Sequence, residues 1–142
     1  MTRPVVRLAT ADDVPACAAV VNDWIDATDW LPRDVPPEEI ERQISEALPD
    51  REIWVAGDPV AGYLSFDPST SRIGGLYISR PGEGLGKALM DRVKEGRDYL
   101  QLWTHLPNRR AQRFYAREGF TATGDEQDGS DNVPEIRMEW KR

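Results

Sequence analysis

Two periods of apolar and polar residues follow one another along the chain, and each change of period marks a new element. Apolar residues three or four positions apart, as at Val14, Cys17 and Val21, are typical of a buried helix face, whereas short alternating or β-branched runs are typical of strands. On this basis we expect strands at about residues 5–8, 52–56, 60–66, 73–78, 99–104, 120–123 and 135–140, and helices at about residues 11–25, 37–48, 87–95 and 106–117.

The order of these expected elements is β-α-α-β-β-β-α-β-α-β-β, in which strands and helices are interleaved. Such interleaving favours an α/β fold with a mixed central sheet flanked by helices. Linkers, low-complexity tracts and internal repeats are absent from the sequence, and 142 residues is close to the usual size of one domain. We therefore expect residues 1–142 to form a single domain.

A glycine loop (residues 81–86) between the expected strand at 73–78 and the following helix is the first chemical signal. Gly82, Gly84 and Gly86 would leave backbone N–H groups bare beside the positive end of a helix, which suits phosphate oxygens. Pro81 and Ala88 exclude a P-loop, and residue 87 is not the third glycine of the dinucleotide-binding pattern. The remaining pattern, Gly-x-Gly-x-Gly/Ala, resembles the acyl-CoA pyrophosphate loop of GNAT enzymes. A plain tight turn is the alternative.

Residues 108–120 read NRRAQRFYAREGF and provide the second signal. They match the GNAT signature Asn-x-x-Ala-x-x-Phe-Tyr-x-x-x-Gly-Phe at every position, and they follow the glycine loop in the correct order. The chain therefore resembles a GNAT N-acetyltransferase of a bacterial subgroup over essentially its whole length. The resemblance implies the acyl-CoA N-acyltransferase fold. It also implies an enzyme that transfers an acetyl group from acetyl-CoA to a primary amine of a small molecule or peptide, by direct attack in a ternary complex.

The resemblance further implies which residues bind acetyl-CoA. In GNAT folds the strand before the glycine loop opens away from the next strand and pairs with pantetheine, and the loop offers amides to the pyrophosphate. Pro81 is a departure, because GNAT proteins usually carry Gln or Arg there and proline removes one donor. Lys87 could instead be a solvated helix residue, and Asn108 could also be a helix N-cap. The implied cofactor-binding residues are Leu76, Tyr77, Ile78, Gly82, Gly84, Leu85, Gly86, Lys87, Ala88 and Asn108.

Acyl transfer to an amine needs a proton donor for the leaving thiolate and a base for the amine. Tyr115 matches the GNAT residue that protonates the thiolate, and a core aromatic is its alternative role. GNAT chains often carry an acidic residue where this chain has Gly74-Gly75, so His105 is the better-placed general base, although a lone histidine is more often structural. We expect Tyr115 and His105 to be the catalytic residues. Further candidates for the base are Glu52, Asp26 and Asp29.

The formal net charge of −7 changes the expected partners. Negative charge repels phosphate backbones and anionic lipids, so nucleic acid and membranes are disfavoured as partners and a positively charged amine is favoured. The end of the first helix mixes aromatic and acidic side chains in the segment that faces the acceptor cleft of GNAT folds, and aromatic faces attract ammonium groups. A packed loop is the alternative for this segment. The expected acceptor-binding residues are Trp24, Asp26, Asp29 and Trp30.

Location, cofactor and assembly complete the expectations. Cys17 is the only cysteine and cannot form an internal disulfide, and neither a signal peptide nor a membrane-spanning run is apparent, so we expect a cytoplasmic protein. Acetyl-CoA is the expected cosubstrate, and no metal is expected. A homodimer would form if the strand at 135–140 exposed an edge to a second copy. An acyl-CoA-binding sensor without turnover is the alternative function, suggested by Pro81 and by the two glycines at 74–75.

Overall fold

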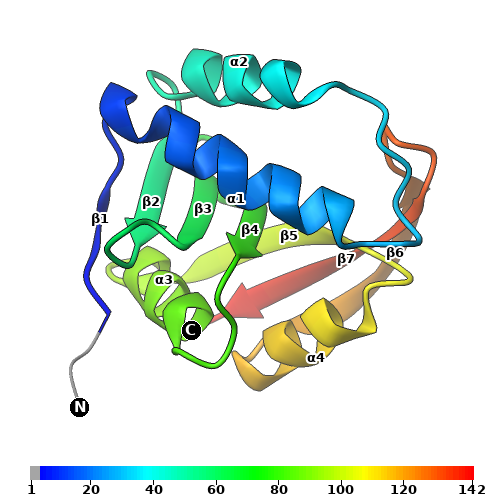
Figure 1. The fold of residues 1–142 in the computed structure, drawn as a ribbon. Helices are drawn as coiled ribbons and strands as arrows, with labels where there is room; N and C mark the ends of the chain where they lie inside the picture. The colour runs from blue at the N-terminus through cyan, green and yellow to red at the C-terminus, as the bar shows by residue number, and fades with distance from the viewer. Residues whose placement is uncertain (1–3) are drawn as a thin grey trace.

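A computed structural model describes residues 4–142, and its helices and strands follow the predicted order (Figure 1). A short 3₁₀ turn, η1 (Ala11–Asp13), precedes the first helix. The helices are α1 (Val14–Asp26), α2 (Pro37–Ala47), α3 (Leu85–Lys94) and α4 (Arg109–Arg117). The strands are β1 (Val6–Leu8), β2 (Glu52–Ala56), β3 (Gly62–Asp67), β4 (Arg72–Ile78), β5 (Tyr99–His105), β6 (Thr121–Asp128) and β7 (Pro134–Lys141).

The strands form one seven-stranded mixed sheet in the order β1-β2-β3-β4-β5-β7-β6. Neighbouring strands are antiparallel except β4 and β5, which run parallel. Strand β7 lies between β5 and β6 and pairs on both sides, so that Met138 faces both Leu102 and Ala122. The expectation that residues 135–140 expose an edge for a second copy is therefore wrong. Strand β6, which extends well beyond the expected 120–123, is the edge on that side.

The two faces of the sheet bury different cores. In β2, Ile53 and Val55 point to one face and Trp54 and Ala56 to the other, because successive side chains of a strand alternate. The first face packs against α1 and α2, where Cys17 is fully buried as predicted, and α1 crosses in front of the sheet in Figure 1. The second face packs against α3. The α3 residues in this second core are Leu85, Leu89, Met90 and Val93.

Apart from α1, whose expected first three residues form the 3₁₀ turn η1, two helices begin at other residues than the sequence pattern predicts. Helix α3 begins at Leu85 rather than at residue 87, because Gly84 adopts a left-handed conformation (φ +75°) and serves as the N-cap. Helix α4 begins at Arg109 rather than at residue 106, because the Leu106 N–H donates to the Pro134 carbonyl at 2.8 Å and extends the pairing between β5 and β7. Between residues 4 and 142, no helix combines the length and apolar character needed to cross a bilayer.

The parallel strands β4 and β5 separate soon after they begin, and this separation opens the site. Their pairing is confined to the first two residues of β4, Arg72 and Ile73. Against β3, Ile73 and Gly75 pair with consecutive residues, so Gly74 is an extra residue that forms a β-bulge. A bulge bends a strand and increases its twist. The rest of β4, through Ile78, therefore leaves the backbone edge that faces β5 without a partner strand.

Candidate active site

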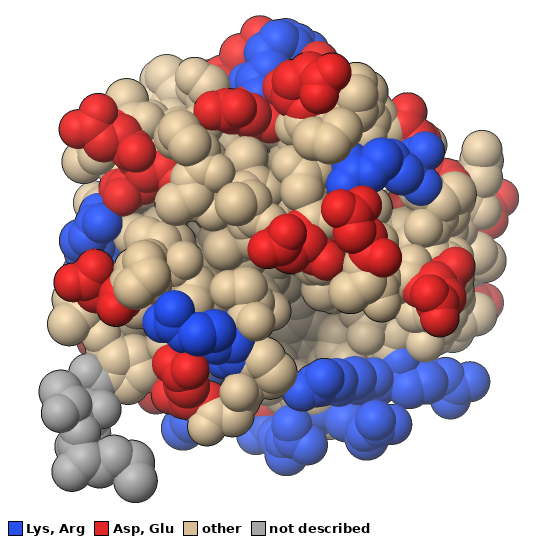
Figure 2. Space-filling view, viewed as in Figure 1, with Lys and Arg blue, Asp and Glu red and all other residues tan. Residues whose placement is uncertain are grey.

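A cleft of about 690 Å³ occupies the gap between β4 and β5. One wall comes from β4 and the glycine loop, and the other comes from the end of β5, the inner face of α4 and the turn between β6 and β7. Figure 2 shows a hollow in this face of the molecule, with basic side chains below it and acidic side chains above it. The predicted site residues that line the cleft are Trp24, Leu76, Tyr77, Ile78, Gly82, Gly84, Leu85, Gly86, Lys87, His105, Asn108 and Tyr115.

The glycine loop presents free backbone amides at the N-terminus of α3. Gly82 and Gly84 have φ angles of +88° and +75°, and a Cβ atom at either position would meet no other atom within 4 Å. Within residues 4–142, no carbonyl accepts a hydrogen bond from the amides between Gly82 and Lys87. The prediction that Ala88 also offers its amide is wrong. Its N–H donates to the Gly84 carbonyl at 3.1 Å and forms the first hydrogen bond of the helix. The loop can therefore bind a phosphate-like anion.

Two residues expected at the cofactor also have partners within the protein. The ammonium group of Lys87 lies 3.3 Å from Asp91 and 3.6 Å from Glu118, and its side chain is 66% exposed. This placement agrees with the alternative of a solvated helix residue. The side-chain oxygen of Asn108 accepts the Ala111 N–H at 3.1 Å, so Asn108 is the N-cap of α4. Its side-chain NH₂ group is directed to no acceptor among the described residues, and it remains available to a ligand.

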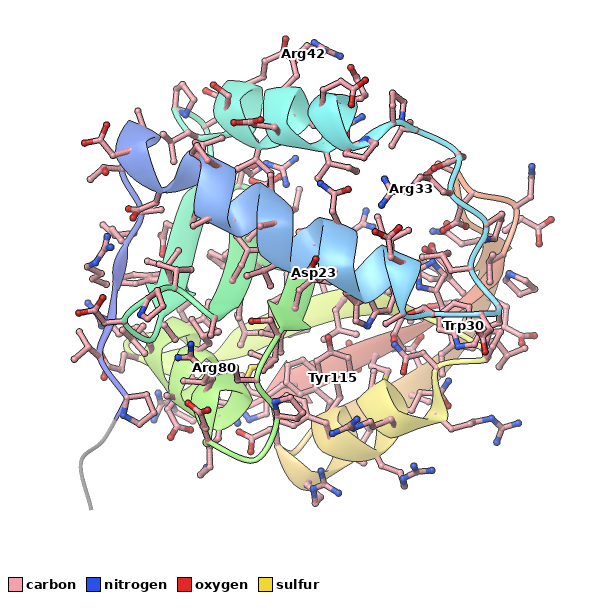
Figure 3. All side chains as sticks on the ribbon, viewed as in Figure 1. Asp23, Trp30, Arg33, Arg42, Arg80 and Tyr115 are labelled. Atoms are coloured by element: carbon pink, nitrogen blue, oxygen red, sulfur yellow. The ribbon has the colours of Figure 1, made fainter. Side chains whose placement is uncertain are left out.

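Arginines that the sequence pattern did not predict also line the cleft. Arg80, labelled in Figure 3, directly precedes the loop and pairs with Glu83 at 3.2 Å. Arg110 and Arg117 line the cleft from α4, and Figure 2 shows basic side chains below the hollow. These arginines add positive charge to the lining of the cleft, although the whole chain carries a net charge of −7. An anionic ligand would therefore be attracted to the cleft where the free amides lie.

Tyr115 projects from α4 into the core and has an exposed fraction of 7% (Figure 3). Its ring packs against Phe114 and Phe120, with centroid separations of 5.5 and 5.7 Å. Its hydroxyl has no hydrogen-bond partner among residues 4–142, and because no buried polar side-chain atom there lacks a partner, this oxygen is open to the cleft that Tyr115 lines. Burial raises the pKa of Tyr115, so the phenol remains protonated at neutral pH. The side chain is therefore both a core aromatic and a hydrogen-bond donor that faces the cleft.

His105 is the last residue of β5, it lines the cleft, and its imidazole is held by a carboxylate. Its Nε2 atom lies 2.7 Å from Oδ2 of Asp131 and 4.0 Å from Oε2 of Glu135. Burial opposes ionisation of Asp131, but hydrogen bonds from the Val133 N–H and from His105 lower the pKa of this carboxyl group. An ionised carboxylate only accepts hydrogen bonds. The proton of the neutral imidazole therefore lies on Nε2, and Nδ1 retains a lone pair that can accept a proton.

Asp131 and Glu135 were not predicted, because neither lies near a motif. The pairing of β5 with β7 places Glu135 directly opposite His105. Asp131 belongs to the preceding turn, where Asn132 adopts a left-handed conformation (φ 65°). The polar tract from Asp128 onward indicates a turn but not the residue that the turn would contact. Only the strand order, with β7 inserted beside β5, would have revealed these two partners of His105.

Two tryptophan side chains also pack near the imidazole of His105. The ring of Trp24 stacks at 6.3 Å from the imidazole, and the ring of Trp30 lies 5.2 Å from it. Trp24 also contacts Tyr77 edge to face at 5.2 Å. A Cβ atom on Gly75 would lie only 2.7 Å from the Tyr77 ring, so glycine is required there. The two tryptophans predicted to contact the acceptor are thus brought together with His105.

The acidic residues predicted from the sequence are not brought to the cleft. Asp26 pairs with Arg33 at 2.9 Å and its side chain is 68% exposed, and Asp29 is also exposed. Glu52 pairs with Arg97 at 2.6 Å, at the start of β2. None of the three lines the cleft. The carboxylates near His105 are instead those of Asp131 and Glu135.

A second cavity, of about 380 Å³, adjoins the cleft on the side of α1 and α2. Its walls come mainly from α1, the loop after α1 and the first turns of α2. The two cavities share one set of lining residues, which we call the junction. The junction residues are Trp24, Tyr77, His105, Ser130 and Asp131. A ligand in either cavity would therefore reach the same imidazole.

Comparisons with known proteins agree with this architecture. A model of the GNAT acetyltransferase domain matches residues 16–142, and no curated protein matches the chain. The protein yncA from Salmonella typhimurium, solved with its cofactor acetyl-CoA, is similar with a TM-score of 0.73 and 21% identity over 99% of this chain and 94% of that one. A ribosomal-protein-alanine N-acetyltransferase from Brucella melitensis is similar with a TM-score of 0.76 and 21% identity over 97% and 99%. At these identities the solved structures show a common fold.

The contact with Asp131 predicts the tautomer of the only histidine. Long-range ¹H–¹⁵N NMR spectra should show the neutral ring of His105 protonated on Nε2. Asp131→Asn should weaken this preference, because an amide can donate as well as accept. The exposed Asp128→Asn variant should leave the spectrum unchanged and serves as the control. A neutral ring protonated on Nδ1 in the unaltered protein would contradict the assignment.

Proposed function

The chain belongs to the GNAT acetyltransferase family, and we propose that it transfers the acetyl group of acetyl-CoA to a primary amine of a small molecule or peptide. Residues 1–142 act as one N-acetyltransferase domain in this proposal. Its main support is a single cleft that contains the free amides of the glycine loop, the hydroxyl of Tyr115 and the imidazole of His105. These groups offer anion binding, a proton donor and a proton acceptor, which are the functions that acyl transfer to an amine requires.

The β4 side of the cleft fits acetyl-CoA. The amides of residues 82–87 would bind the pyrophosphate beside the positive end of α3, and Arg80 would add charge in place of the side chain that Pro81 lacks. Residues 76–78 would hydrogen-bond pantetheine along the unpaired edge of β4, as an added strand does, and Asn108 would contribute its free NH₂ group. When bound, acetyl-CoA supplies the thioester whose acetyl group is transferred.

Tyr115 serves as the general acid in this mechanism. Its hydroxyl would give its proton to the sulfur as the carbon–sulfur bond breaks, and it would recover a proton from solvent through the open cleft. Because burial raises its pKa, the phenol is the form present at neutral pH, and the same burial favours its return to that form. The packing of the ring between two phenylalanines keeps the hydroxyl in one position.

His105 serves as the general base. Its Nδ1 atom would take a proton from the ammonium group of the acceptor, directly or through one water, so that the neutral nitrogen forms the new carbon–nitrogen bond. Asp131 is a positioning residue in this scheme, because its carboxylate holds the proton of the imidazole on Nε2. The His105 and Asp131 pair thus takes the place of the acidic residue that GNAT chains often carry where this chain has Gly74-Gly75. For this reason we favour an enzyme over a non-catalytic acyl-CoA sensor.

Gly84→Asp should abolish acetyl-CoA binding with little effect on the fold. The new carboxylate would project into the anion site, and we expect a loss of affinity of at least about tenfold, equivalent to about 1.4 kcal/mol. Acetyl-CoA should raise the melting temperature of the unaltered protein, because a ligand of the native state stabilises it by mass action. That shift should disappear in the variant.

Gly96→Asp is the matched control for this experiment. Gly96 has a φ of +73° and no atom within 4 Å of its Cβ position, so both substitutions strain the backbone equally in open space. Gly96 lies beyond the C-terminus of α3, away from the loop. Its variant should therefore keep the thermal shift with acetyl-CoA. Equal shifts in the two variants would remove the glycine loop from the proposal.

Tyr115→Phe should lower kcat by about 10²–10⁴-fold, the usual range for general acid–base catalysis. Acetyl-CoA affinity should change little, because the lost interaction belongs to the transition state. Tyr63→Phe provides the control, since Tyr63 is equally buried (6% exposed) and lines neither cavity. Steady-state release of CoA measures both variants. If Tyr115→Phe and Tyr63→Phe retained similar kcat values, Tyr115 would be only a core residue.

A further inference from the structure

The loop between α1 and α2 (residues 27–36) forms part of the wall of the second cavity, and its backbone does little to hold it in place. Residues 31–35 of this loop line the second cavity, and none of them lines the cleft. Within the part of the chain that the structure describes, the N–H groups of residues 33–35 donate to no backbone carbonyl. The residues on either side of this stretch are prolines, which have no N–H to donate. The loop therefore depends on side chains to keep its place beside α1.

The side chain of Arg33 attaches this loop to α1. Its guanidinium group donates to the side-chain oxygen of Asn22 at 2.9 Å and to the carboxylate of Asp26 at 2.9 Å, and both of these residues belong to α1. It also donates to the backbone carbonyls of Asn22, at 3.4 Å, and Val35, at 3.2 Å. Figure 3 shows Arg33 reaching from the loop toward α1. One planar group thus joins the helix to the loop.

Trp30 lies in the same loop, close to the junction. Its ring lies 5.2 Å from the imidazole of His105 and 6.0 Å from the ring of Trp24. At the start of the loop, the hydroxyl of Thr28 donates to the Trp24 carbonyl at 2.6 Å. The segment that carries Trp30 is therefore attached to α1 on both sides, by Thr28 before it and by Arg33 after it.

We propose that Arg33 is a positioning residue for the amine acceptor. By attaching the loop to α1, its guanidinium group holds Trp30 beside His105 and fixes the wall of the second cavity next to the junction. This inference rests on the proposed acetyl transfer and identifies what shapes the acceptor side of the site. Arg33 is not assigned as a ligand of the acceptor, because its guanidinium group already donates to α1 and to the loop, and Asp26 balances its charge.

The positioning role depends on the shape of the guanidinium group as well as on its charge. A planar fork donates to several acceptors in a fixed geometry, whereas a lysine ammonium group is a compact charge on a flexible stem. Lysine at this position should retain the ion pair with Asp26 and lose the contacts with Asn22 and Val35. We therefore expect Arg33→Lys to restore little of what Arg33→Met removes.

The NMR signals of His105 test this role without any substrate. His105 is the only histidine of the chain, so its ring C–H signals are unambiguous, and they report on aromatic rings nearby. Arg33→Met and Asn22→Ala should both shift these signals, because Trp30 would no longer be held beside the imidazole. Arg42→Met is the matched control, since Arg42 also pairs with two carboxylates but lines neither cavity. Unchanged signals in Arg33→Met would overturn the inference.

Steady-state kinetics test the effect on the acceptor. The probe is the most active member of a panel of butylamine, 1,4-diaminobutane, phenethylamine and a lysine-containing peptide. Arg33→Met should raise the KM of that amine at least about tenfold, while kcat falls by a smaller factor and the KM of acetyl-CoA is unchanged. A role in stability alone would lower the fraction of active enzyme, and hence the apparent kcat, without changing KM. That result would contradict the positioning role.

Asn22→Ala separates positioning from direct contact with the amine. Asn22 lines neither cavity, but its side chain accepts a hydrogen bond from Arg33. Its variant should raise the KM of the amine in the same direction as Arg33→Met. An unchanged KM in Asn22→Ala, or full recovery of KM in Arg33→Lys, would show that Arg33 acts through its charge and would overturn the inference.

The positioning role and acetyl transfer fail in different ways. Shifted His105 signals in Arg33→Met, without acetylation of any of the four amines, would support the positioning role and count against acetyl transfer. Acetylation with unchanged His105 signals would support acetyl transfer and overturn the positioning role. Shifted signals together with a raised KM are the result expected from both.

Discussion

The loss of pairing between β4 and β5 is the constraint on which the site depends. In a parallel pair, each strand normally satisfies the backbone of its neighbour along the whole length. Here the bulge at Gly74 bends β4 after two paired residues, and a cleft replaces the remaining pairing. Gly75 then leaves room for the ring of Tyr77, which separates the cleft from the second cavity. Gly74 and Gly75 therefore have a structural role in opening the site.

The distribution of charge along the cleft matches the proposed division of labour. Free amides and Arg80 lie where the glycine loop leads into α3, whereas the carboxylates of Asp131 and Glu135 lie beside His105. An anionic cosubstrate and a cationic amine would thus be drawn to different groups in one space. Tyr115 lines the same space, and its buried ring cannot move without disturbing the core. The net charge of −7 does not by itself indicate where positive and negative groups lie in the cleft.

Features that depend on neighbouring residues in the sequence were predictable, whereas features that depend on contacts between distant residues were not. The element order, the glycine loop and the motif at 108–120 are local, and the α/β fold with a mixed sheet is confirmed. The partners of His105 depend on the insertion of β7 between β5 and β6, which no local pattern records. The sequence favours Asp26 as an acceptor ligand, and it does not reveal the pairing with Arg33, because that pairing depends on how the loop folds back on α1. The glycine pattern also does not show that Gly84 is the N-cap of α3, so the prediction that the Ala88 amide is free for the cofactor is wrong.

Hydrogen exchange with and without acetyl-CoA tests the central claim most directly. The claim is that the unpaired edge of β4 and the free amides of the glycine loop hold the cosubstrate. Acetyl-CoA should therefore slow exchange in residues 74–78 and 82–87, while residues 52–56 in β2, paired on both sides, should exchange as before. Unchanged exchange in both of the first two segments, despite binding of acetyl-CoA, would contradict the account.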